Sequence, residues 1–236
     1  NARKLDVNIK SLKVGTGFWG VGKYFGSVSS SSVTIGDISG NDGVTASTYG
    51  MVGTCHSPDT TYFVNNKVKI DKVKLNGSFF GVLGSVSQKM LDQTVELGEI
   101  EAATVTGLGS ISRTTERLNY SLTSALATTG NCFGASSGSF PIKDSKINIG
   151  TVTSAKGNAY GGISATLDHV EVKIGSVESS EKEAMACGDN MYAEIKDSSI
   201  SVGKVTSPLS NAYGFAKTLQ GSIKNSSIDF GEVSAV

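Results

Sequence analysis

The chain has 236 residues, 38% of them apolar, with 21 basic and 21 acidic side chains. The apolar content argues against a disordered chain, and the zero formal net charge removes the electrostatic signature of nucleic-acid binding. Three prolines, 29 glycines and many Val, Ile, Ser and Thr residues favour an all-β protein with frequent turns.

The first residues, NARKLDVNIK (1–10), do not resemble a signal peptide, so a signal peptide, if there was one, has been removed. No apolar run along the chain approaches the roughly 18 residues of a transmembrane helix. We therefore expect no membrane span and no nucleic-acid partner.

A pattern of apolar–x–apolar–Gly–x–apolar recurs nine times, loosely in some copies. In chain order the segments are VNIKSL (7–12), VTIGDI (33–38), VKIDKV (68–73), VELGEI (95–100), YSLTSA (120–125), INIGTV (147–152), VKIGSV (172–177), ISVGKV (200–205) and IDFGEV (228–233). Their fourth positions are Lys10, Gly36, Asp71, Gly98, Thr123, Gly150, Gly175, Gly203 and Gly231. These are spaced by 26, 35, 27, 25, 27, 25, 28 and 28 residues, a period that is typical of a solenoid.

Each segment predicts a strand followed by a corner. The apolar residues three and one positions before the fourth position point inward, because alternate residues of a strand share a face. The next apolar residue comes three positions later, so two consecutive residues face outward and the chain bends. Glycine suits a corner because it tolerates positive φ. Thr123 at the same position also allows a bend that needs no positive φ.

These features predict one β-solenoid domain over residues 1–236, with about nine coils of about 27 residues, each with three short strands and three corners. Right-handed winding is expected because parallel crossovers overwhelmingly take that hand. Nine coils at the strand spacing give a rod of roughly 40 Å. A sandwich of antiparallel hairpins would not explain the repeated register.

Two further columns keep the same period. An aromatic residue precedes glycine in most coils, and Thr106–Gly107 and Cys187–Gly188 are aligned with the two gaps. The aromatic ladder so predicted consists of Trp19, Tyr49, Phe80, Phe133, Tyr160 and Tyr213. Facing inward it would add stacking and rigidity, and facing outward it would form a sugar-binding strip. The second column, eight residues before the fourth position, consists of Val28, Phe63, Met90, Thr115, Ile142, Leu167, Ile195 and Ile223.

The longer spacing after Gly36 indicates an insertion near residues 53–66, which we interpret as a surface loop in preference to a binding loop. Its Cys55–His56 pair is a poor catalytic candidate, because adjacent side chains usually point apart. The stretch GDISGNDG (36–43) offers oxygen ligands for calcium, but turn chemistry explains it better.

Most enzymatic signatures are missing from the sequence. It has two histidines and no phosphate-binding loop, Cys-x-x-Cys or His-Glu-x-x-His motif. Asp168 and His169 break the strand period between two apolar residues, which predicts a solvated corner instead of a site. We expect no enzyme, no cofactor and no bound metal. A carbohydrate-active solenoid enzyme is the least favoured alternative, because acids and bases are scattered along the chain.

The three cysteines cannot all pair within one chain. Cys132 and Cys187 lie two coils apart, about 10 Å, which is too far for a disulfide. We expect buried thiols, and an intermolecular disulfide through Cys55 remains open.

Neither end of the repeat array shows a polar cap or a helix, so we expect either a fragment or subunits whose ends cover each other. The residues expected at these stacking ends are Val7, Ile9, Leu12, Ile228, Phe230 and Val233. Contact between two different ends would propagate into a head-to-tail homopolymer.

The segments FPIKDSKINIGTVTS (140–154), AEIKDSSISVGKVTS (193–207) and GSIKNSSIDFGEVSAV (221–236) resemble the Gly-rich GLUG-type and haemagglutinin-like repeats of secreted bacterial surface proteins. The resemblance is clearest over residues 130–236 and implies an extracellular, cell-surface or matrix setting without catalytic residues. The leading hypothesis is therefore a secreted protein that self-assembles into a surface filament or an amyloid-like, biofilm-type matrix. The alternative is the stalk of an adhesin or phage fibre that binds surface glycans.

Overall fold

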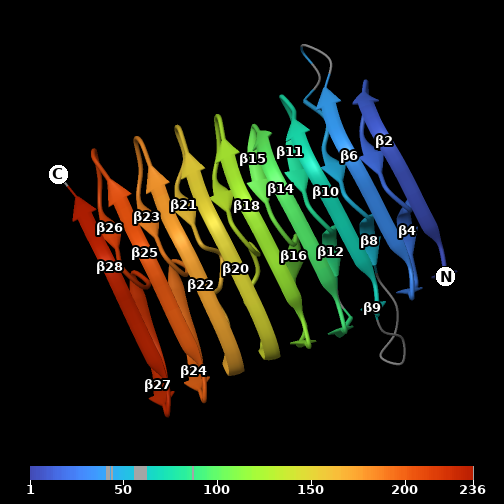
Figure 1. The fold of residues 1–236 in the computed structure, drawn as a ribbon. Helices are drawn as coiled ribbons and strands as arrows, with labels where there is room; N and C mark the ends of the chain where they lie inside the picture. Colours follow the sequence, from blue (N-terminus) through green and yellow to red (C-terminus); the bar gives the residue numbers. More distant parts are fainter. Residues whose placement is uncertain (41–42, 44, 56–62, 87, 236) are drawn as a thin grey trace.

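The computed structural model describes residues 1–236 except 41–42, 44, 56–62, 87 and 236. Within the described residues every regular element is a β-strand, and strands of successive turns lie side by side in parallel (Figure 1). The chain forms a β-solenoid of about 8 turns of roughly 27 residues, which confirms the predicted fold class. The nine repeat segments are nine successive long strands, and the turns connect them.

The largest sheet has 16 strands in two adjoining columns. Its long column carries the repeat segments and consists of β2 (Asp6–Val14), β6 (Ser32–Gly40), β10 (Lys67–Lys74), β14 (Thr94–Ala102), β18 (Asn119–Ala127), β20 (Ile142–Ser154), β22 (Leu167–Ser179), β25 (Ser199–Ser207) and β28 (Ser227–Ala235). Its short column consists of β1 (Ala2–Arg3), β5 (Val28–Ser29), β9 (Phe63–Val64), β13 (Met90–Leu91), β17 (Thr115–Glu116), the first residues of β20 and β22, β24 (Asn190–Lys196) and β27 (Thr218–Lys224).

Two smaller sheets complete the turns. The 8-stranded sheet consists of β3 (Phe18–Trp19), β7 (Thr48–Tyr49), β11 (Ser78–Phe80), β15 (Thr104–Thr106), β19 (Cys132–Phe133), β21 (Ala159–Tyr160), β23 (Ala184–Met185) and β26 (Ala212–Tyr213). The 4-stranded sheet consists of β4 (Gly22–Phe25), β8 (Val52–Cys55), β12 (Leu83–Val86) and β16 (Ser110–Ile111). It ends at a single bridge between Gly109 and Ser136, and loops form this side of the later turns. Among the described strands, each of the first four turns holds four, as in β5 to β8, and the later turns hold two or three, so the prediction of three strands per coil does not hold along the whole solenoid.

The inward-facing columns form one continuous core. In β10, Val68, Ile70 and Val73 are each at most 1% exposed, as the spacing within the repeat predicts. The column eight residues before the fourth position pairs from turn to turn as predicted, for example Met90 with both Phe63 and Thr115. Like residues therefore stack on like along the axis, and each interior turn is buried by its two neighbours.

The fourth position of the repeat is a bend of the form that needs no positive φ. Strand pairing skips this column, as between Ile70↔Leu97 and Lys72↔Glu99 in β10 and β14. None of its glycines is among the positive-φ residues, so of the two kinds of bend that the sequence allowed, the structure has the one without positive φ. Glycine is needed for space instead. A Cβ built on Gly175 would lie 2.6 Å from the carbonyl oxygen of Gly150 in the preceding turn.

The positive-φ corner lies six residues earlier, between the two columns of the large sheet. One non-glycine residue per turn adopts φ between 47° and 56° there: Lys4, Ser30, Asn65, Asp92, Arg117, Asp144, His169, Asp197 and Asn225. The following residue turns inward, and in several turns a polar side chain of the next turn accepts a hydrogen bond from its buried N–H. Ser145 Oγ accepts from Leu118 N at 2.9 Å, and Ser198 Oγ accepts from Val170 N at 3.0 Å. These serines therefore satisfy backbone groups that the corner would otherwise bury without a partner.

Candidate functional site

The two outermost turns form the end surfaces that the sequence predicts as stacking ends. At the amino end, Val7, Ile9 and Leu12 of β2 are half-buried and pack against the core from one side only. At the carboxyl end, Ile228 of β28 is also half-buried. The six predicted residues thus lie in two groups, one on each end surface, because they occupy the same columns in the first and last turns.

The carboxyl end surface exposes large apolar side chains. Phe230 and Val233 are 43% and 45% exposed, whereas Val202 and Val205, which pair with them in β25, are 2% and 0% exposed. The difference is the missing neighbour on one side. Leu219 and Ile223 of β27 are 43% and 46% exposed on the same end. Neither was among the predicted stacking-end residues, although Ile223 is the last member of a column that the sequence analysis had identified.

Both end surfaces also present backbone. Among the described strands, β2 pairs only with β6 and β28 only with β25, so one edge of each has no strand partner. Unpaired strand edges are templates for further β-pairing. A strand added at either edge in the existing orientation would continue the parallel sheet.

The aromatic ladder lies on the outer face of the 8-stranded sheet. Trp19 and Tyr49 stack with ring centroids 6.1 Å apart, Tyr49 and Phe80 at 5.0 Å, and Phe133 and Tyr160 at 4.6 Å. Thr106 interrupts the ladder as predicted, because it pairs with both Phe80 and Phe133.

The predicted position of Cys187–Gly188 in this column is wrong. Met185 pairs with both Tyr160 and Tyr213, so Met185 and Ala186 occupy the column. Cys187 comes two residues later and is fully buried. The alignment failed because the turn between Gly161 and Ala186 is two residues shorter than the Cys–Gly pairing assumes.

Ring orientation limits what the ladder can bind. The stacked rings lie within 5° to 11° of parallel, so each ring covers the face of its neighbour and presents an edge to solvent. Burial, partly offset by a hydrogen bond from Asn158, raises the pKa of the Tyr160 phenol. This geometry supports the rigid stacking that was expected of an inward ladder, although the ladder faces outward. Sugar stacking needs ring faces.

A groove of about 1060 Å³ follows the positive-φ corner along the later turns. Arg117, Asp144, His169 and Asp197 line it. The serines that line it are already engaged by the backbone: Ser198 Oγ, for example, also donates to the carbonyl oxygen of Lys196 at 2.7 Å. The groove is therefore largely a consequence of how the corner is built.

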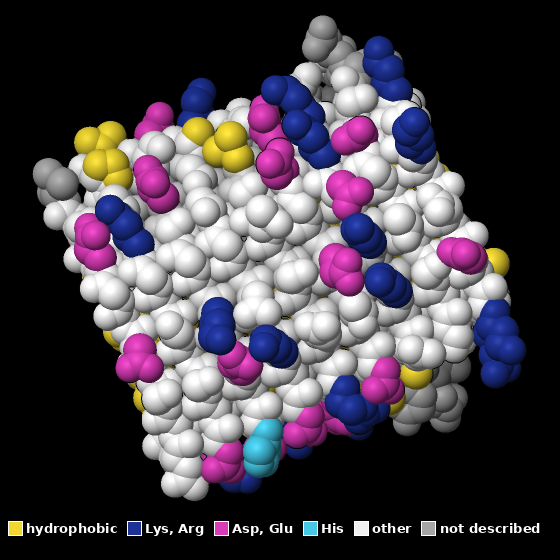
Figure 2. Space-filling view, in the orientation of Figure 1, with side chains coloured by type: hydrophobic (Ala, Val, Ile, Leu, Met, Phe, Trp, Pro, Cys, Tyr) yellow, Lys and Arg dark blue, Asp and Glu magenta, His cyan; other side chains and the backbone are white. Residues whose placement is uncertain are grey.

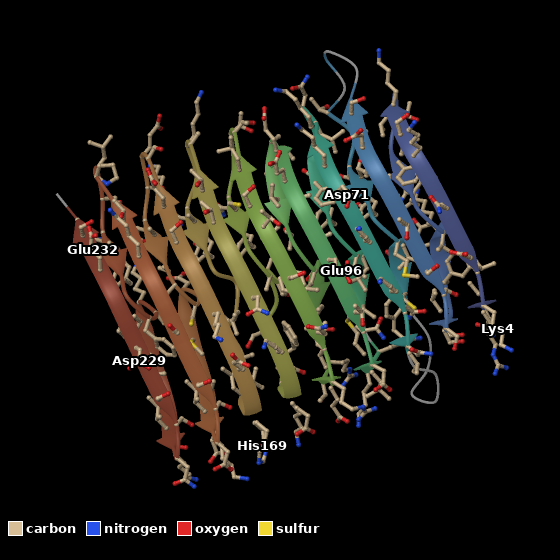
Figure 3. All side chains as sticks on the ribbon, viewed as in Figure 1. Lys4, Asp71, Glu96, His169, Asp229 and Glu232 are labelled. Atoms are coloured by element: carbon tan, nitrogen blue, oxygen red, sulfur yellow. The ribbon has the colours of Figure 1, made fainter. Side chains whose placement is uncertain are left out.

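Asp168, His169 and Asp197 bring three possible metal ligands within 4.8 Å of one another in this corner. His169 Nδ1 lies 2.9 Å from Asp168 Oδ1, and the ammonium group of Lys196 lies 3.7 Å from that oxygen and 3.5 Å from Asp197 Oδ2. Lys143 lies 3.9 Å from the other Asp168 oxygen. Lysines therefore already balance the two carboxylates. His169 is exposed at a positive-φ corner, as predicted, and Asp168 is less exposed than expected because it faces these cations (Figure 3).

All three cysteines are buried free thiols, as predicted. Burial raises the pKa of Cys55 to about 11 and those of Cys132 and Cys187 to about 12. None is therefore placed as a nucleophile. His56 and the rest of the insertion at 56–62 lie outside the described residues, as do residues 41–42 of the calcium candidate stretch.

Comparison with protein-family models, curated proteins and solved structures finds no match to the chain. Among the described residues no helix is long and apolar enough to span a membrane. The end surfaces are the most developed candidate site, because they combine unpaired strand edges, exposed apolar side chains and a register that the other turns define.

Proposed function

We propose that this protein is a secreted structural protein whose copies stack end to end by β-strand pairing into an extracellular fibre or matrix. The last turn of one copy pairs with the first turn of the next, so β28 of one copy lies beside β2 of its neighbour. The secreted setting is part of the proposal and is supported by the resemblance to bacterial surface repeats. The protein acts as a scaffold and performs no catalysis.

The observation that carries the proposal is the match between the two end surfaces. The first and last long strands present the same columns of the repeat, with Val7, Ile9 and Leu12 at one end and Ile228, Phe230 and Val233 at the other. Head-to-tail contact would bury Phe230 against Ile9 and Val233 against Leu12. Since nearly half of Phe230 and Val233 is still exposed, each would gain roughly 1 kcal/mol on burial.

Backbone pairing would supply the geometry of this contact. A parallel strand beside β28 would extend each ladder by one residue without changing its direction. The last strand of the added copy would again have an unpaired edge, so a further copy could add there. Because this contact between unlike surfaces would continue along the solenoid axis, it would not close into a ring, and the assembly would grow as a filament.

A glycan-binding adhesin or phage-fibre stalk is the alternative proposal. The stacked rings of the aromatic ladder present edges, so a sugar would have to bind other groups. A cavity of about 320 Å³ beside Phe133 and Tyr160, lined also by Ser164 and Asp189, is the place to look for it.

The test is negative-stain electron microscopy of the purified chain after dilution from denaturant, with no other component present. Unbranched filaments with an axial repeat near roughly 40 Å, the length that the strand spacing gives for nine stacked long strands, are expected. The variant Val7→Lys with Ile9→Lys should not assemble, because it places charges in the apolar part of the contact.

The matched control is Asn8→Lys with Ser11→Lys, which adds the same charges to the outward face of the same strand. It should assemble at least as well as the parent, because its added charges stay out of the apolar contact. Circular dichroism and urea unfolding of both variants establish that the subunit is folded. Dispersed short rods of the parent protein, or filaments of normal length from the Val7 and Ile9 variant, would contradict the proposal.

A further inference from the structure

Ion pairs between neighbouring turns are a regular feature of the outer face of the long sheet. Opposite charges lie side by side on this face (Figure 2). Lys74 and Glu101, in register on β10 and β14, are 3.3 Å apart, and Lys204 and Glu232 on β25 and β28 are 3.2 Å apart. Each turn is thus matched in charge to its neighbour at several places.

A second kind of pair links columns two residues apart. Lys67 Nζ lies 3.5 Å from Glu96, although the strand register places Lys67 opposite Thr94. The acidic side chain therefore belongs to the later turn and lies two residues further along the strand. This offset is a geometry that two adjacent turns of the solenoid accommodate.

The end surfaces carry opposite charges at this same offset. If the register of β25 and β28 continues into a second copy, Phe230 lies opposite Ile9 and Val233 opposite Leu12. Asp229 then meets Asn8, and Lys10 lies two residues further along. Lys10 and Asp229 are exposed, and no ion pair among the described residues involves either.

The same construction places Glu232 two residues from Lys13 of the next copy. Glu232 keeps its partner Lys204 within its own chain, so it would bridge two cations. Figure 3 shows Asp229 and Glu232 together on the last long strand, with Lys4 at the opposite end of the solenoid. The last long strand therefore carries two acids, and β2 at the other end carries Lys10 and Lys13 together with Asp6 at its start.

From this charge pattern we infer that the joint between copies is an ionic lock that allows only head-to-tail contact, with Asp229 and Glu232 of one copy facing Lys10 and Lys13 of the next. The inference rests on the proposed end-to-end function and adds the partner surface, its polarity and its sensitivity to salt. Head-to-head contact would place Lys10 and Lys13 of one copy against the same two lysines of the other copy. Tail-to-tail contact would place the two acids of one copy against the same acids of the other. Both arrangements are repulsive, and both would also need antiparallel pairing at the edge.

A charge-reversal cycle on one pair tests the inference. Lys10→Asp places two acids at every joint, and Asp229→Lys places two cations there. Each single variant should raise the critical concentration for filament formation about fivefold, as expected for turning one exposed ion pair into a repulsion. The double variant carries the exchanged pair at every joint and should return to within about twofold of the parent.

Lys156→Asp is the matched control, because Lys156 is exposed in a loop between β20 and β21, away from both end strands. It makes the same change of net charge and should leave the critical concentration unchanged. The difference between parent and single variants should vanish in about 1 M salt, where the screening length is roughly 3 Å.

The outcomes separate this inference from the proposed function. If the parent forms no filaments, the end-to-end contact and the ionic lock both fail. If the parent forms filaments and the single variants assemble equally well, the ionic lock fails and the scaffold function stands. Additive effects in the double variant, without recovery, would also overturn the lock. The ionic lock is supported if both single variants assemble less well than the parent and the double variant recovers the critical concentration of the parent.

Discussion

Replacing Ser198 by alanine tests whether the polar corner column holds the turns together. Ser198 is 6% exposed, and its hydroxyl accepts a hydrogen bond from the backbone N–H of Val170 in the preceding turn at 3.0 Å. Alanine leaves that donor buried without a partner, because Val170 is only 2% exposed. An unsatisfied buried donor costs about 1–3 kcal/mol. The carbonyl of Lys196, at the exposed corner, can exchange its lost donor for water.

We therefore expect Ser198→Ala to lower the free energy of unfolding by about 2 kcal/mol. The effect should be local, because the solenoid is stabilised by contacts between neighbouring turns. Hydrogen exchange read by mass spectrometry should show the amide of Val170 opening about 30-fold more often, the factor that corresponds to 2 kcal/mol. Urea unfolding followed by circular dichroism gives the global value.

Ser199→Ala is the matched control, because it removes an exposed hydroxyl from the next residue of the same chain segment. It should change stability by no more than about 0.5 kcal/mol. Ser226→Ala should have a smaller effect than Ser198→Ala, because Ser226 lies in the last turn and is less buried. Equal effects at Ser198 and Ser199, or unchanged exchange of the Val170 amide, would refute the reasoning.

Three further predictions follow from the fold. Gly175→Val should destabilise the protein by at least about 2 kcal/mol, because the added Cβ would meet the preceding turn. Ser176→Val, on the outer face, should be nearly neutral. Similar urea unfolding midpoints for the two variants would contradict this. In the native protein no thiol should react with a disulfide reagent at about pH 8, because burial raises the pKa values of all three cysteines. All three should react in denaturant. Reaction of even one cysteine in the native protein would contradict its burial. The hydrogen bond from Arg117 lowers the pKa of the Asp92 carboxyl in the folded protein. The stability that this pair contributes is therefore fully present above the unfolded pKa of 3.8 and is lost as the pH falls through the lower folded pKa. Asp92→Asn should flatten the acid side of the stability profile, and an unchanged profile would show that the pair contributes nothing.

The repeat could be predicted from sequence because every turn buries the same columns. Val68, Ile70 and Val73 face inward for the same reason as their counterparts in each other turn, so one pattern repeated nine times outweighs its irregular copies. The end residues followed directly from this register.

What was not predicted lies where the constraint is not hydrophobic. The positive-φ corner accepts residues as different as Lys4, Arg117 and His169, because their side chains face solvent and only the backbone conformation is shared. Its signal was available, since it falls six residues before the fourth position in every turn. The orientation of the aromatic rings depends on stacking between turns, which residue type alone does not reveal.

The end turns should also be the least stable part of an isolated copy, and this gives an independent measure of assembly. An interior strand such as β25 has neighbours on both sides, whereas β28 has one, and its apolar residues remain nearly half exposed. Assembly would supply the missing neighbour, and a contact made only by the folded state raises stability with protein concentration. Hydrogen exchange in β2 and β28 should therefore slow as the concentration rises, while exchange in β14 should stay unchanged. Uniform exchange along the solenoid, or no dependence on concentration in β2 and β28, would show that the end surfaces do not meet each other in solution.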